Sequence, residues 1–278
     1  MDDNNRVPFH LWLTSTNNPK LKIASKLKDQ KHRKKAGLFL IEGYRELSRY
    51  LEGIESISLG FSAPKWVFFC SELFLNKEAF FLLEKFSCMG SKLFQVSSSI
   101  FSSVLSHRDR PDGLLAVSQI PNRDLTIWTP NLAERIAVLD RIEKPGNLGA
   151  ILRSGDAAGL QAIILSDPIS DIWNPNAVRS SLGALFTVPV FHDSSHNIYD
   201  WLKKQGYQLL ATKPRIGKPL KEIDWAKPTA FLIGSEQFGL SSFWMDRSDY
   251  FVSIPMFGKV DSLNVSTAAA IFFFAPLI

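Results

Sequence analysis

The stretch that decides the fold is Phe251-Val-Ser-Ile-Pro-Met-Phe-Gly-Lys-Val-Asp-Ser-Leu-Asn-Val-Ser-Thr-Ala-Ala-Ala-Ile271. It begins as a short apolar strand that breaks at Pro255, and it then crosses a turn that contains Gly258. A helix of small residues is expected after Ser262–Ser266, because polar residues of these types cap helix N-termini. Backbone N–H groups and side-chain amides are therefore expected to gather at one turn.

Two earlier segments have the same character of a loop before a helix, at residues 138–153 and 231–241. In this order, the three segments resemble the signature blocks of the SpoU-type RNA ribose 2′-O-methyltransferases. The matching residues are Asn147-Leu-Gly149 with Arg153, Gly234-Ser-Glu236 with Gly239, and Ile254-Pro-Met256 with Ser262-Leu-Asn-Val-Ser266. Three ordered blocks over about 130 residues are a far more specific signal than one glycine-rich loop.

The resemblance implies an α/β fold: a trefoil-knotted methyltransferase domain on a parallel sheet, assembled as a homodimer. It also implies S-adenosyl-L-methionine as cofactor and no metal ion. By the resemblance, the backbone around the adenosine belongs to Thr212, Gly234, Ile254 and Leu263. The residues that the resemblance assigns to catalysis are Arg153, Asn147, Glu236, Ser262 and Asn264.

Arg153 is the residue expected to act on the substrate. In a mostly apolar helix its guanidinium must find water or a partner. The structural alternative is an ion pair with Asp156 or Glu236. By the resemblance, Arg153 instead lies near the target phosphate and 2′-hydroxyl. Gly155 and Asp156 depart from the small or apolar residues usual in the first block, which predicts a less stable helix or an unusual ion pair there.

Charge is concentrated in the N-terminal half. The chain has 278 residues, is 45% hydrophobic and carries a net charge of +5. Residues 1–125 hold 18 Lys and Arg against 13 Asp and Glu, whereas residues 126–278 hold 14 of each. This asymmetry favours binding of a polyanion such as RNA by the N-terminal part. The alternative is a basic helix face that only contacts solvent. The expected RNA contacts are Lys31, Arg33, Lys34, Lys35 and Arg179, the last of which could instead pair within a subunit interface.

The first half of the chain resembles the N-terminal substrate-binding domain of many SpoU enzymes, which is related to ribosomal L30-type RNA binders. The residues that carry this resemblance are Asn18-Pro-Lys20, Phe39-Leu-Ile-Glu-Gly43 and Ser106-His-Arg-Asp-Arg-Pro-Asp-Gly-Leu-Leu-Ala116. We therefore expect a small L30-like α/β RNA-binding domain at 1–120, a linker at 121–131 and the methyltransferase domain at 132–278. Periodicity predicts one helix from Leu21 to about Lys35 and a strand over Phe186–Phe191.

The remaining features indicate a soluble cytoplasmic protein. Cys70 and Cys88 form no CxxC or Cys/His ligand pattern, which fits free thiols in a reducing compartment. The N-terminus has no secretory signal, and the longest late apolar run, 268–278, is about half a membrane span. Pro276 predicts a short final helix. That helix contributes to the family's dimer interface. A final helix shorter than that of relatives is therefore expected to offer less surface for dimerisation.

The expected activity is methyl transfer from S-adenosylmethionine to a ribose 2′-hydroxyl of ribosomal RNA, that of the large subunit. The alternatives are a tRNA ribose 2′-O-methyltransferase and a non-catalytic RNA-binding protein that keeps the fold. Intact Arg153, Glu236 and Asn264 argue against the non-catalytic alternative.

Overall fold

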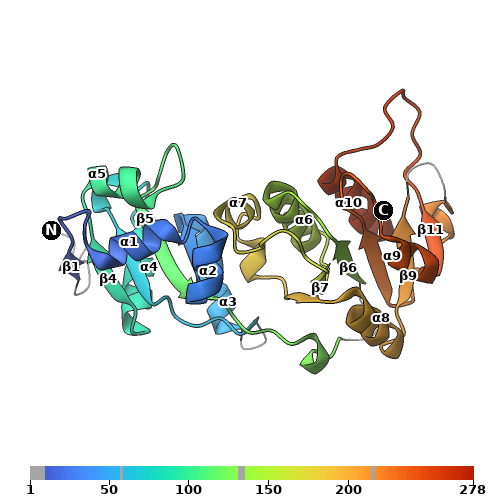
Figure 1. Ribbon diagram of the computed structural model, residues 1–278, viewed down its shortest axis with the longest axis horizontal. Coiled ribbons are helices and arrows are strands. Elements are labelled where there is room, and N and C mark those ends of the chain that lie inside the picture. The colour runs from blue at the N-terminus through green and yellow to red at the C-terminus, as the bar shows by residue number, and fades with distance from the viewer. Residues whose placement is uncertain (1–9, 57–58, 131–134, 214–216) are drawn as a thin grey trace. The chain divides into compact units, whose positions relative to one another are not determined.

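The computed structural model describes residues 10–56, 59–130, 135–213 and 217–278, and the chain divides into two compact units (Figure 1). Unit 1 comprises Met1–Asn122 together with Trp173–Phe186. Unit 2 comprises Arg123–Ile172 and Thr187–Ile278. The chain thus passes between the units three times, and the segment Trp173–Phe186 belongs to a different unit from its neighbours in sequence.

Unit 1 is built on a five-stranded mixed sheet in the order β1-β4-β3-β5-β2. β5 pairs antiparallel with both of its neighbours, and the other pairs are parallel. Every residue of the central strand β3 and of the edge strand β2 is buried, so both faces of the sheet are covered at its centre and at this edge. The strands are β1 (Leu11–Trp12), β2 (Leu38–Glu42), β3 (Trp66–Phe69), β4 (Lys92–Gln95) and β5 (Leu114–Gln119).

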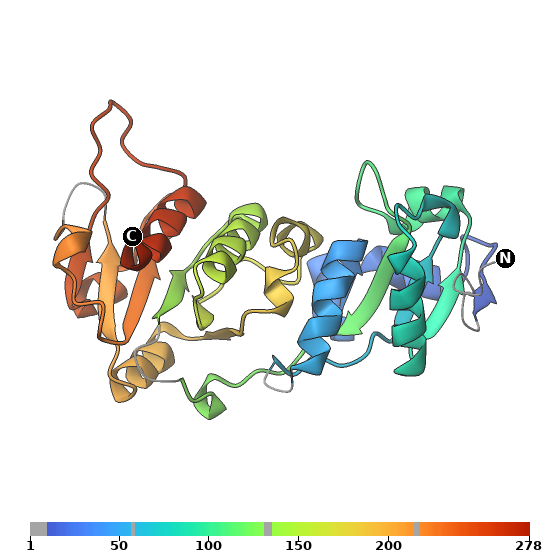
Figure 2. The same cartoon turned by 180° about the vertical axis from the view of Figure 1, so that it is seen from behind.

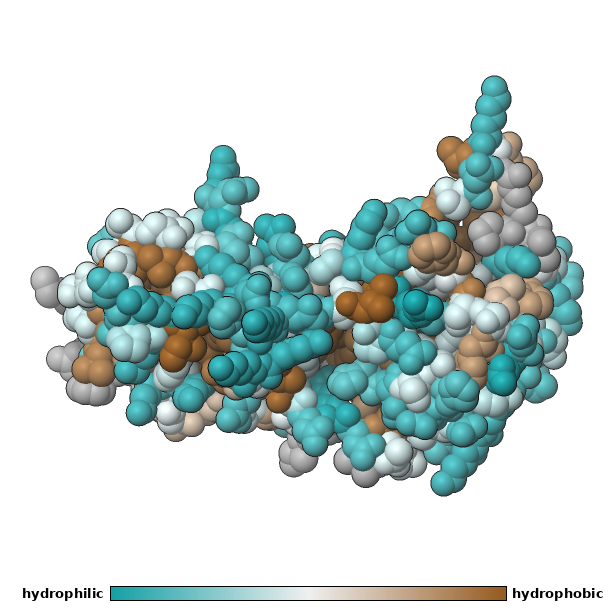
Figure 3. All heavy atoms as spheres, in the orientation of Figure 1, coloured by the Kyte–Doolittle hydropathy of each residue, from teal (hydrophilic) through white to brown (hydrophobic). Residues whose placement is uncertain are grey.

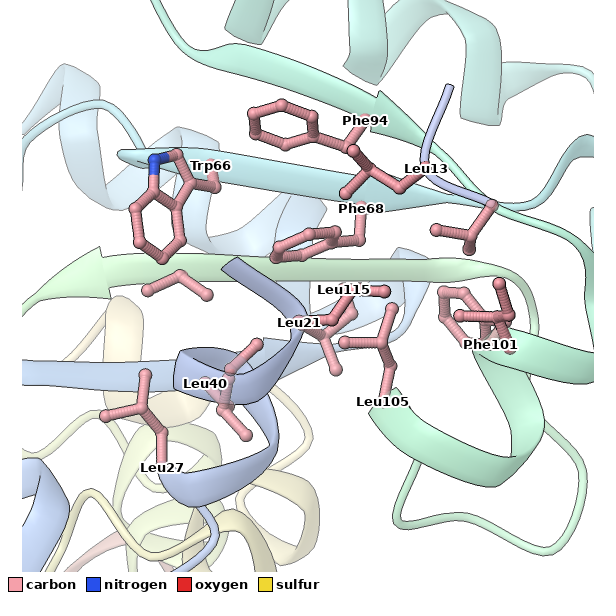
Figure 4. Packing of buried hydrophobic residues seen from close by; sticks show 14 of the residues in the cluster. Leu13, Leu21, Leu27, Leu40, Trp66, Phe68, Phe94, Phe101, Leu105 and Leu115 are labelled. Carbon is pink, nitrogen blue, oxygen red and sulfur yellow. The ribbon is translucent and has the colours of Figure 1, made fainter. Parts of the chain in front are cut away.

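Helices pack against both sides of this sheet, and one face forms a large apolar core. Figure 4 shows Leu21 and Leu27, from the first helical segment, packed with Leu40, Phe68 and Leu115 of the strands. The α-helices of the unit are α1 (Pro19–Lys26), α2 (Gln30–Ala36), α3 (Tyr44–Glu55), α4 (Glu78–Cys88), α5 (Ser98–Ile100) and α7 (Pro175–Ser180). The other helical segments are the 3₁₀ turns η3 (Ser71–Leu73) and η6 (Ala184–Phe186) and the π-helical segment η4 (Phe101–Leu105).

The single helix predicted from Leu21 to about Lys35 is wrong, because the segment forms two helices. The side chain of Asp29 accepts hydrogen bonds from the backbone N–H groups of Lys31 at 2.8 Å and His32 at 3.4 Å, and so starts α2. An Asp at this position satisfies donors that have no partner inside the helix. Gly37, in the left-handed region at φ 63°, ends α2.

The strand predicted over Phe186–Phe191 is also wrong in its first half. Phe186 ends η6 and is fully buried within unit 1, where its ring lies 5.1 Å from that of Tyr50 and 5.5 Å from that of Phe61. Strand β8 begins only at Val190. An aromatic cluster, rather than sheet pairing, therefore determines the conformation at Phe186.

Unit 2 is built on a six-stranded sheet in the order β11-β9-β10-β6-β7-β8, and all of its pairs are parallel. The predicted α/β class with a parallel sheet is confirmed. The strands are β6 (Arg135–Asp140), β7 (Ala162–Ser166), β8 (Val190–Asp193), β9 (Gln208–Thr212), β10 (Thr229–Ile233) and β11 (Tyr250–Val252). The helices are α6 (Pro145–Ala157), α8 (Ser195–Lys204), α9 (Ser242–Arg247) and α10 (Val265–Phe274), with turns η5 (Leu125–Ile127), η7 (Leu220–Glu222) and η8 (Ala275–Leu277).

Helix α6 continues through the two unusual residues of the first block. A Cβ atom on Gly155 would lie 2.9 Å from Cδ1 of Ile163, so glycine allows α6 to lie close to β7. Asp156 accepts a hydrogen bond from Oγ1 of Thr187 at 2.8 Å. Helix α10 ends at Phe274, two residues before Pro276, as the sequence predicts. Among the described residues, no helix is both long and apolar enough to cross a membrane.

Candidate functional site

A pocket of about 600 Å³ lies at the carboxyl-end edge of the unit 2 sheet. Because all six strands are parallel, the segments that follow β6, β9, β10 and β11 meet at this edge. Ligands of open α/β sheets bind at such edges. The pocket is lined by eight of the nine residues that the sequence assigned to the donor and to catalysis in this half: Asn147, Thr212, Gly234, Glu236, Ile254, Ser262, Leu263 and Asn264.

Side chains from the three sequence blocks meet at this pocket. Nδ2 of Asn147 donates a hydrogen bond to Oε1 of Glu236 at 2.6 Å. Nδ2 of Asn264 donates to Oδ1 of Asn147 at 3.4 Å. Oε2 of Glu236 also accepts from the backbone N–H of Glu143 at 3.3 Å. Residues that lie far apart in the sequence are therefore linked in one chain of hydrogen bonds, and each loop holds the next in place.

The loop after β10 closes tightly on itself. The backbones of Ser235 and Gly239 exchange two hydrogen bonds of 3.0 Å. A Cβ atom on Gly234 would lie 2.1 Å from the backbone of Gly239 and Leu240, so no side chain can be accommodated there. Gly234 is therefore required by a close approach of backbone to backbone, which also leaves the backbone of this loop lining the pocket.

Two polar side chains of the pocket are held by secondary structure. Oγ1 of Thr212 donates to the carbonyl oxygen of Leu232 at 2.9 Å and so ties β9 to β10. Asn264 caps α10. Its Oδ1 accepts two hydrogen bonds from Ser266, one from the backbone N–H at 2.9 Å and one from the side-chain hydroxyl at 2.7 Å. The long loop between β11 and α10 leads into this cap and leaves the body of the unit in both views (Figures 1 and 2).

Arg153 lies on α6 with an exposed side chain and is not among the residues that line the pocket. Neither ion pair considered for it is found: Asp156 bonds to Thr187, and Glu236 bonds to Asn147. Within the described part of the chain, the Arg153 guanidinium has no hydrogen-bond or ion-pair partner. It is therefore available to a group that approaches α6 from outside.

Asp140 supports this site without lining the pocket, and the sequence interpretation did not single it out. It ends β6, is 1% exposed, and its Oδ2 accepts the backbone N–H of Ser241 at 2.7 Å. Burial raises the pKa of the Asp140 carboxyl, although the hydrogen bonds from Ser241 oppose that effect. Its position at the carboxyl end of a strand, within the first segment at 138–153, is the signal that identifies it in the sequence. Asp140 thus anchors the end of the loop that contains Gly234 and Glu236.

The predicted RNA contacts belong to unit 1 and fall into two groups. Lys31, Lys34 and Lys35 are exposed on α2, and Figure 3 shows a hydrophilic surface over this helix. Arg179 is exposed at the end of α7. Arg33, in contrast, is 1% exposed and its Nη1 donates to the carbonyl oxygens of Leu27 and Lys28, each at 2.8 Å. The inclusion of Arg33 among the RNA contacts is therefore corrected: it joins α1 to α2.

The fold and the pocket define an α/β enzyme with a ligand site among three loops, and comparisons with known proteins identify the class. The SpoU rRNA Methylase family matches residues 134–274, and the MRM3-like substrate binding domain matches residues 18–116. The chain belongs to the SpoU rRNA methylase family, and the family resemblance noted in the sequence is confirmed.

Individual relatives cover nearly the whole chain. The chain is 30% identical over 259 residues to the Bacillus subtilis protein named 23S rRNA (guanosine(2553)-2′-O)-methyltransferase RlmP, covering 93% of this chain and 96% of that one. It is also 30% identical to the 23S rRNA (uridine(2479)-2′-O)-methyltransferase of Streptomyces viridochromogenes, covering 95% and 91%. The crystal structure of an AdoMet-bound rRNA methyltransferase from Sinorhizobium meliloti superposes with a TM-score of 0.83 at 27% identity, covering 95% and 96%.

Proposed function

We propose that this protein transfers a methyl group from S-adenosylmethionine to a ribose 2′-hydroxyl of ribosomal RNA of the large subunit. The observation that carries the proposal is the meeting of Asn147, Glu236 and Asn264 at one pocket of about 600 Å³. Membership of the SpoU family and the names of two relatives, both 23S rRNA 2′-O-methyltransferases, support the same reaction and substrate.

The pocket fits S-adenosylmethionine. Its volume lies within the range of about 300–1,000 Å³ that is usual for small-molecule sites. Its wall combines the loop backbone at Gly234 with the apolar side chains of Ile254 and Leu263. When bound, the donor supplies a sulfonium methyl group, whose C–S bond breaks to a neutral thioether as the new C–O bond forms. Asn147 and Glu236 hold the surrounding loops, and Ser262 and Asn264 offer polar contacts to the bound molecules.

The hydroxyl must lose its proton as the C–O bond forms, and we assign this step to the neighbourhood of Arg153. Arginine remains protonated in proteins and is a poor base. Its guanidinium can, however, hold a phosphate in bidentate geometry. In this proposal, Arg153 fixes the phosphate of the target nucleotide, that phosphate accepts the hydroxyl proton, and the proton then passes to water. Correct placement of the two reactants provides much of the acceleration.

The trefoil knot and the homodimer expected from the family, and the cytoplasmic location expected from the sequence, are also part of this proposal. Unit 2 exposes several large apolar side chains, which support a subunit interface; these are Phe257, Val260, Ile271, Leu277 and Ile278. Cys70 and Cys88 are both free thiols, which suits a reducing compartment. Sedimentation analysis of the full-length chain is expected to give the mass of a dimer, and a monomer at every concentration would remove this part of the proposal.

The function is tested with the full-length chain in two stages. Calorimetric titration is expected to show one site per subunit for S-adenosylmethionine and for S-adenosylhomocysteine. Ribose methylation is then mapped in total RNA from cells with and without the gene, where one position of large-subunit ribosomal RNA is expected to lose its methyl group. A folded chain that binds no donor would contradict the enzymatic proposal, and loss of methylation only in tRNA would contradict the substrate.

A further inference from the structure

A second pocket lies wholly within unit 1 and shares no residue with the pocket of unit 2. It has a volume of about 380 Å³, which is enough for a small ligand. Its walls come from the start of α3, the segment before α4, the loop before β5, and the end of α7. Three arginines line it, Arg45, Arg108 and Arg179, and we refer to it as the arginine pocket.

The three arginines differ in whether their guanidinium groups already have hydrogen-bond or ion-pair partners. Nη2 of Arg108 donates to Oε1 of Glu46 at 2.8 Å and to the carbonyl oxygen of Glu42. Glu46 is 3% exposed, so Arg108 is neutralised by a buried carboxylate. Arg45 and Arg179 are exposed, and neither has a hydrogen-bond or ion-pair partner in the described ranges of the chain. Two guanidinium groups thus line one cavity with their donors unused, an arrangement that suits a phosphate group.

The rest of the wall suits a base rather than a second anion. Tyr44 contributes a partly exposed aromatic side chain, and Leu75 and Leu182 contribute apolar surface. Bases that are not paired stack on such side chains in RNA-binding proteins. Asp112 also lines the pocket: its Oδ2 accepts the backbone N–H of Tyr44 at 2.7 Å, and its Oδ1 is buried with no hydrogen-bond partner among the described residues, so it can accept a donor group of the ligand.

The turn that brings α7 to the pocket has an unusual backbone. Leu182 has a φ of 51° although it is not a glycine, and the next residue, Gly183, has a φ of 94°. A Cβ atom on Gly183 would lie 2.5 Å from Cγ of Arg49, on α3. Conformations of this kind cost energy and persist where the surrounding structure fixes them, often at functional sites. Here the turn holds Leu182 in the wall of the cavity, one turn of chain after Arg179.

We propose that the arginine pocket binds one unpaired nucleotide of the RNA substrate, with its phosphate on Arg45 and Arg179 and its base against Tyr44 and Leu182. The inference rests on the proposed action on RNA and assigns unit 1 a preference for RNA that contains an unpaired residue. A surface that contacts only phosphates would bind paired and unpaired RNA alike.

The test compares two RNA hairpins of equal length, one fully paired and one with a single bulged nucleotide, bound to the full-length protein in a fluorescence anisotropy titration. The wild-type protein is expected to bind the bulged hairpin about tenfold more tightly, the effect of stacking one base. The Arg45→Ala/Arg179→Ala variant is expected to lose this preference. A matched control, Lys77→Ala/Lys92→Ala, removes two exposed cations that do not line the pocket and is expected to keep the preference.

A second pair of variants isolates the base contact. Tyr44→Ala is expected to lose the preference and Tyr44→Phe to keep it, because only the ring is needed for stacking. Equal binding of both hairpins by the wild-type protein, or an equal loss of preference in the arginine and lysine variants, would overturn the proposal. Circular dichroism and urea denaturation of each full-length variant report whether unit 1 is folded, because the pocket proposed for the donor lies in unit 2. The wild-type protein could bind the donor and methylate ribosomal RNA and yet bind both hairpins with equal affinity. That result would refute the proposed role of the arginine pocket alone and leave the proposed function intact.

Discussion

Arg153 combines two properties that set it apart from the residues that line the pocket of unit 2, for which we propose donor binding and which we call the donor pocket. Its side chain is exposed on α6, and it lies outside the pocket wall that contains Asn147, Glu236 and Asn264. Both carboxylates that could neutralise it bond elsewhere. Its charge is therefore available to the substrate and is not needed to hold the fold, so chemistry and donor binding can be separated experimentally.

Replacement of Arg153 by alanine is expected to lower the rate of methyl transfer by about 100-fold or more, because the phosphate that accepts the proton would no longer be held in place. Donor affinity is expected to stay nearly unchanged, because Arg153 does not line the donor pocket. Single-turnover methylation and calorimetric titration measure the two effects separately. Arg153→Lys keeps the positive charge but lacks the planar guanidinium group that can hold a phosphate through two hydrogen bonds. This variant is therefore expected to recover only part of the rate. Near-normal turnover by a folded Arg153→Ala variant would show that this arginine is not involved.

Glu42 is a buried acid in unit 1 whose role is structural. Its side chain accepts hydrogen bonds from the Ser106 hydroxyl at 2.5 Å and from the backbone N–H of His107 at 3.0 Å, and it pairs with the His107 ring. Burial alone would raise the pKa of Glu42. The hydrogen bonds from His107, the positive charge of its ring and the hydrogen bond from Ser106 all lower this pKa, and together they exceed the effect of burial. The pKa of Glu42 therefore lies below its ordinary value of 4.5.

This lowered pKa has a definite sign in the pH dependence of folding. The ionised Glu42 contributes stability above pH 4.5, and that contribution is lost as the pH falls through the lower pKa of the folded state. Glu42→Gln is expected to reduce the unfolding free energy at neutral pH by about 3–5 kcal/mol and to flatten its decline in acid. Urea denaturation over a pH series measures both, with exposed Glu84→Gln as the control. A parallel pH profile for wild type and Glu42→Gln would refute this assignment.

The sequence predicted which residues line the pocket of unit 2 but not how they contact one another. The family resemblance was enough to place Thr212, Gly234 and Leu263: Thr212 ends a parallel strand, Gly234 follows one, and Leu263 precedes a helix. The hydrogen bond between Asn147 and Glu236 depends on side-chain conformations that no spacing specifies. Arg33 shows the opposite failure: a basic run gives no sign of which member turns inward to bond to backbone carbonyls.

At the scale of the element, α2 presents its basic residues in a way that supports RNA binding. Because Arg33 is buried, the exposed charge of this helix consists of three lysines, Lys31, Lys34 and Lys35. No ion pair to a carboxylate is found for these three among the residues described. The helix is short and is held by a cap at each end, so its lysines are displayed from a fixed backbone.

Neutralisation of this face by Lys31→Gln/Lys34→Gln/Lys35→Gln is expected to weaken RNA binding and to flatten its salt dependence. Each lost phosphate contact reduces the log–log slope by about 0.7 to 0.9. Donor affinity is expected to remain as in the wild type. The measurement is RNA affinity over a salt series, and the matched control is a triple variant at Lys77, Lys85 and Lys92. An unchanged slope would mean that α2 only contacts solvent.

Helices and strands could be predicted from the sequence where local signals agreed. The predictions failed where contacts between residues distant in the sequence decide the conformation. The parallel strands of unit 2 were predicted well because their apolar runs are long and bounded by turns. The division between α1 and α2 was missed although Asp29 is a cap residue, because the basic and apolar periodicity continues across it. Phe186 was assigned to a strand from its local apolar pattern. The aromatic partners that determine its conformation, Phe39, Tyr50 and Phe61, lie more than a hundred residues earlier in the chain, where a local pattern cannot reveal them.

For the whole molecule, the segment Trp173–Phe186 matters most, because it lies within the methylase-family match yet packs as part of unit 1. Phe186 is fully buried there. Replacement by alanine, Phe186→Ala, is expected to lower the unfolding free energy by about 3–5 kcal/mol. Phe81→Ala, at a side chain that is 54% exposed, serves as the control and is expected to change it little. Similar effects of the two variants in thermal and urea denaturation would contradict the burial of Phe186 in unit 1.

The three passages of the chain between the units have a consequence for how such proteins can diversify. A gene fusion or crossover near residue 122 exchanges only part of unit 1, because Trp173–Phe186 is encoded further downstream. A chimera that takes its first 122 residues from a relative would therefore bring together two surfaces that were never selected to fit each other. Productive recombination would require a second exchange at the downstream segment, so the two stretches are expected to be inherited together.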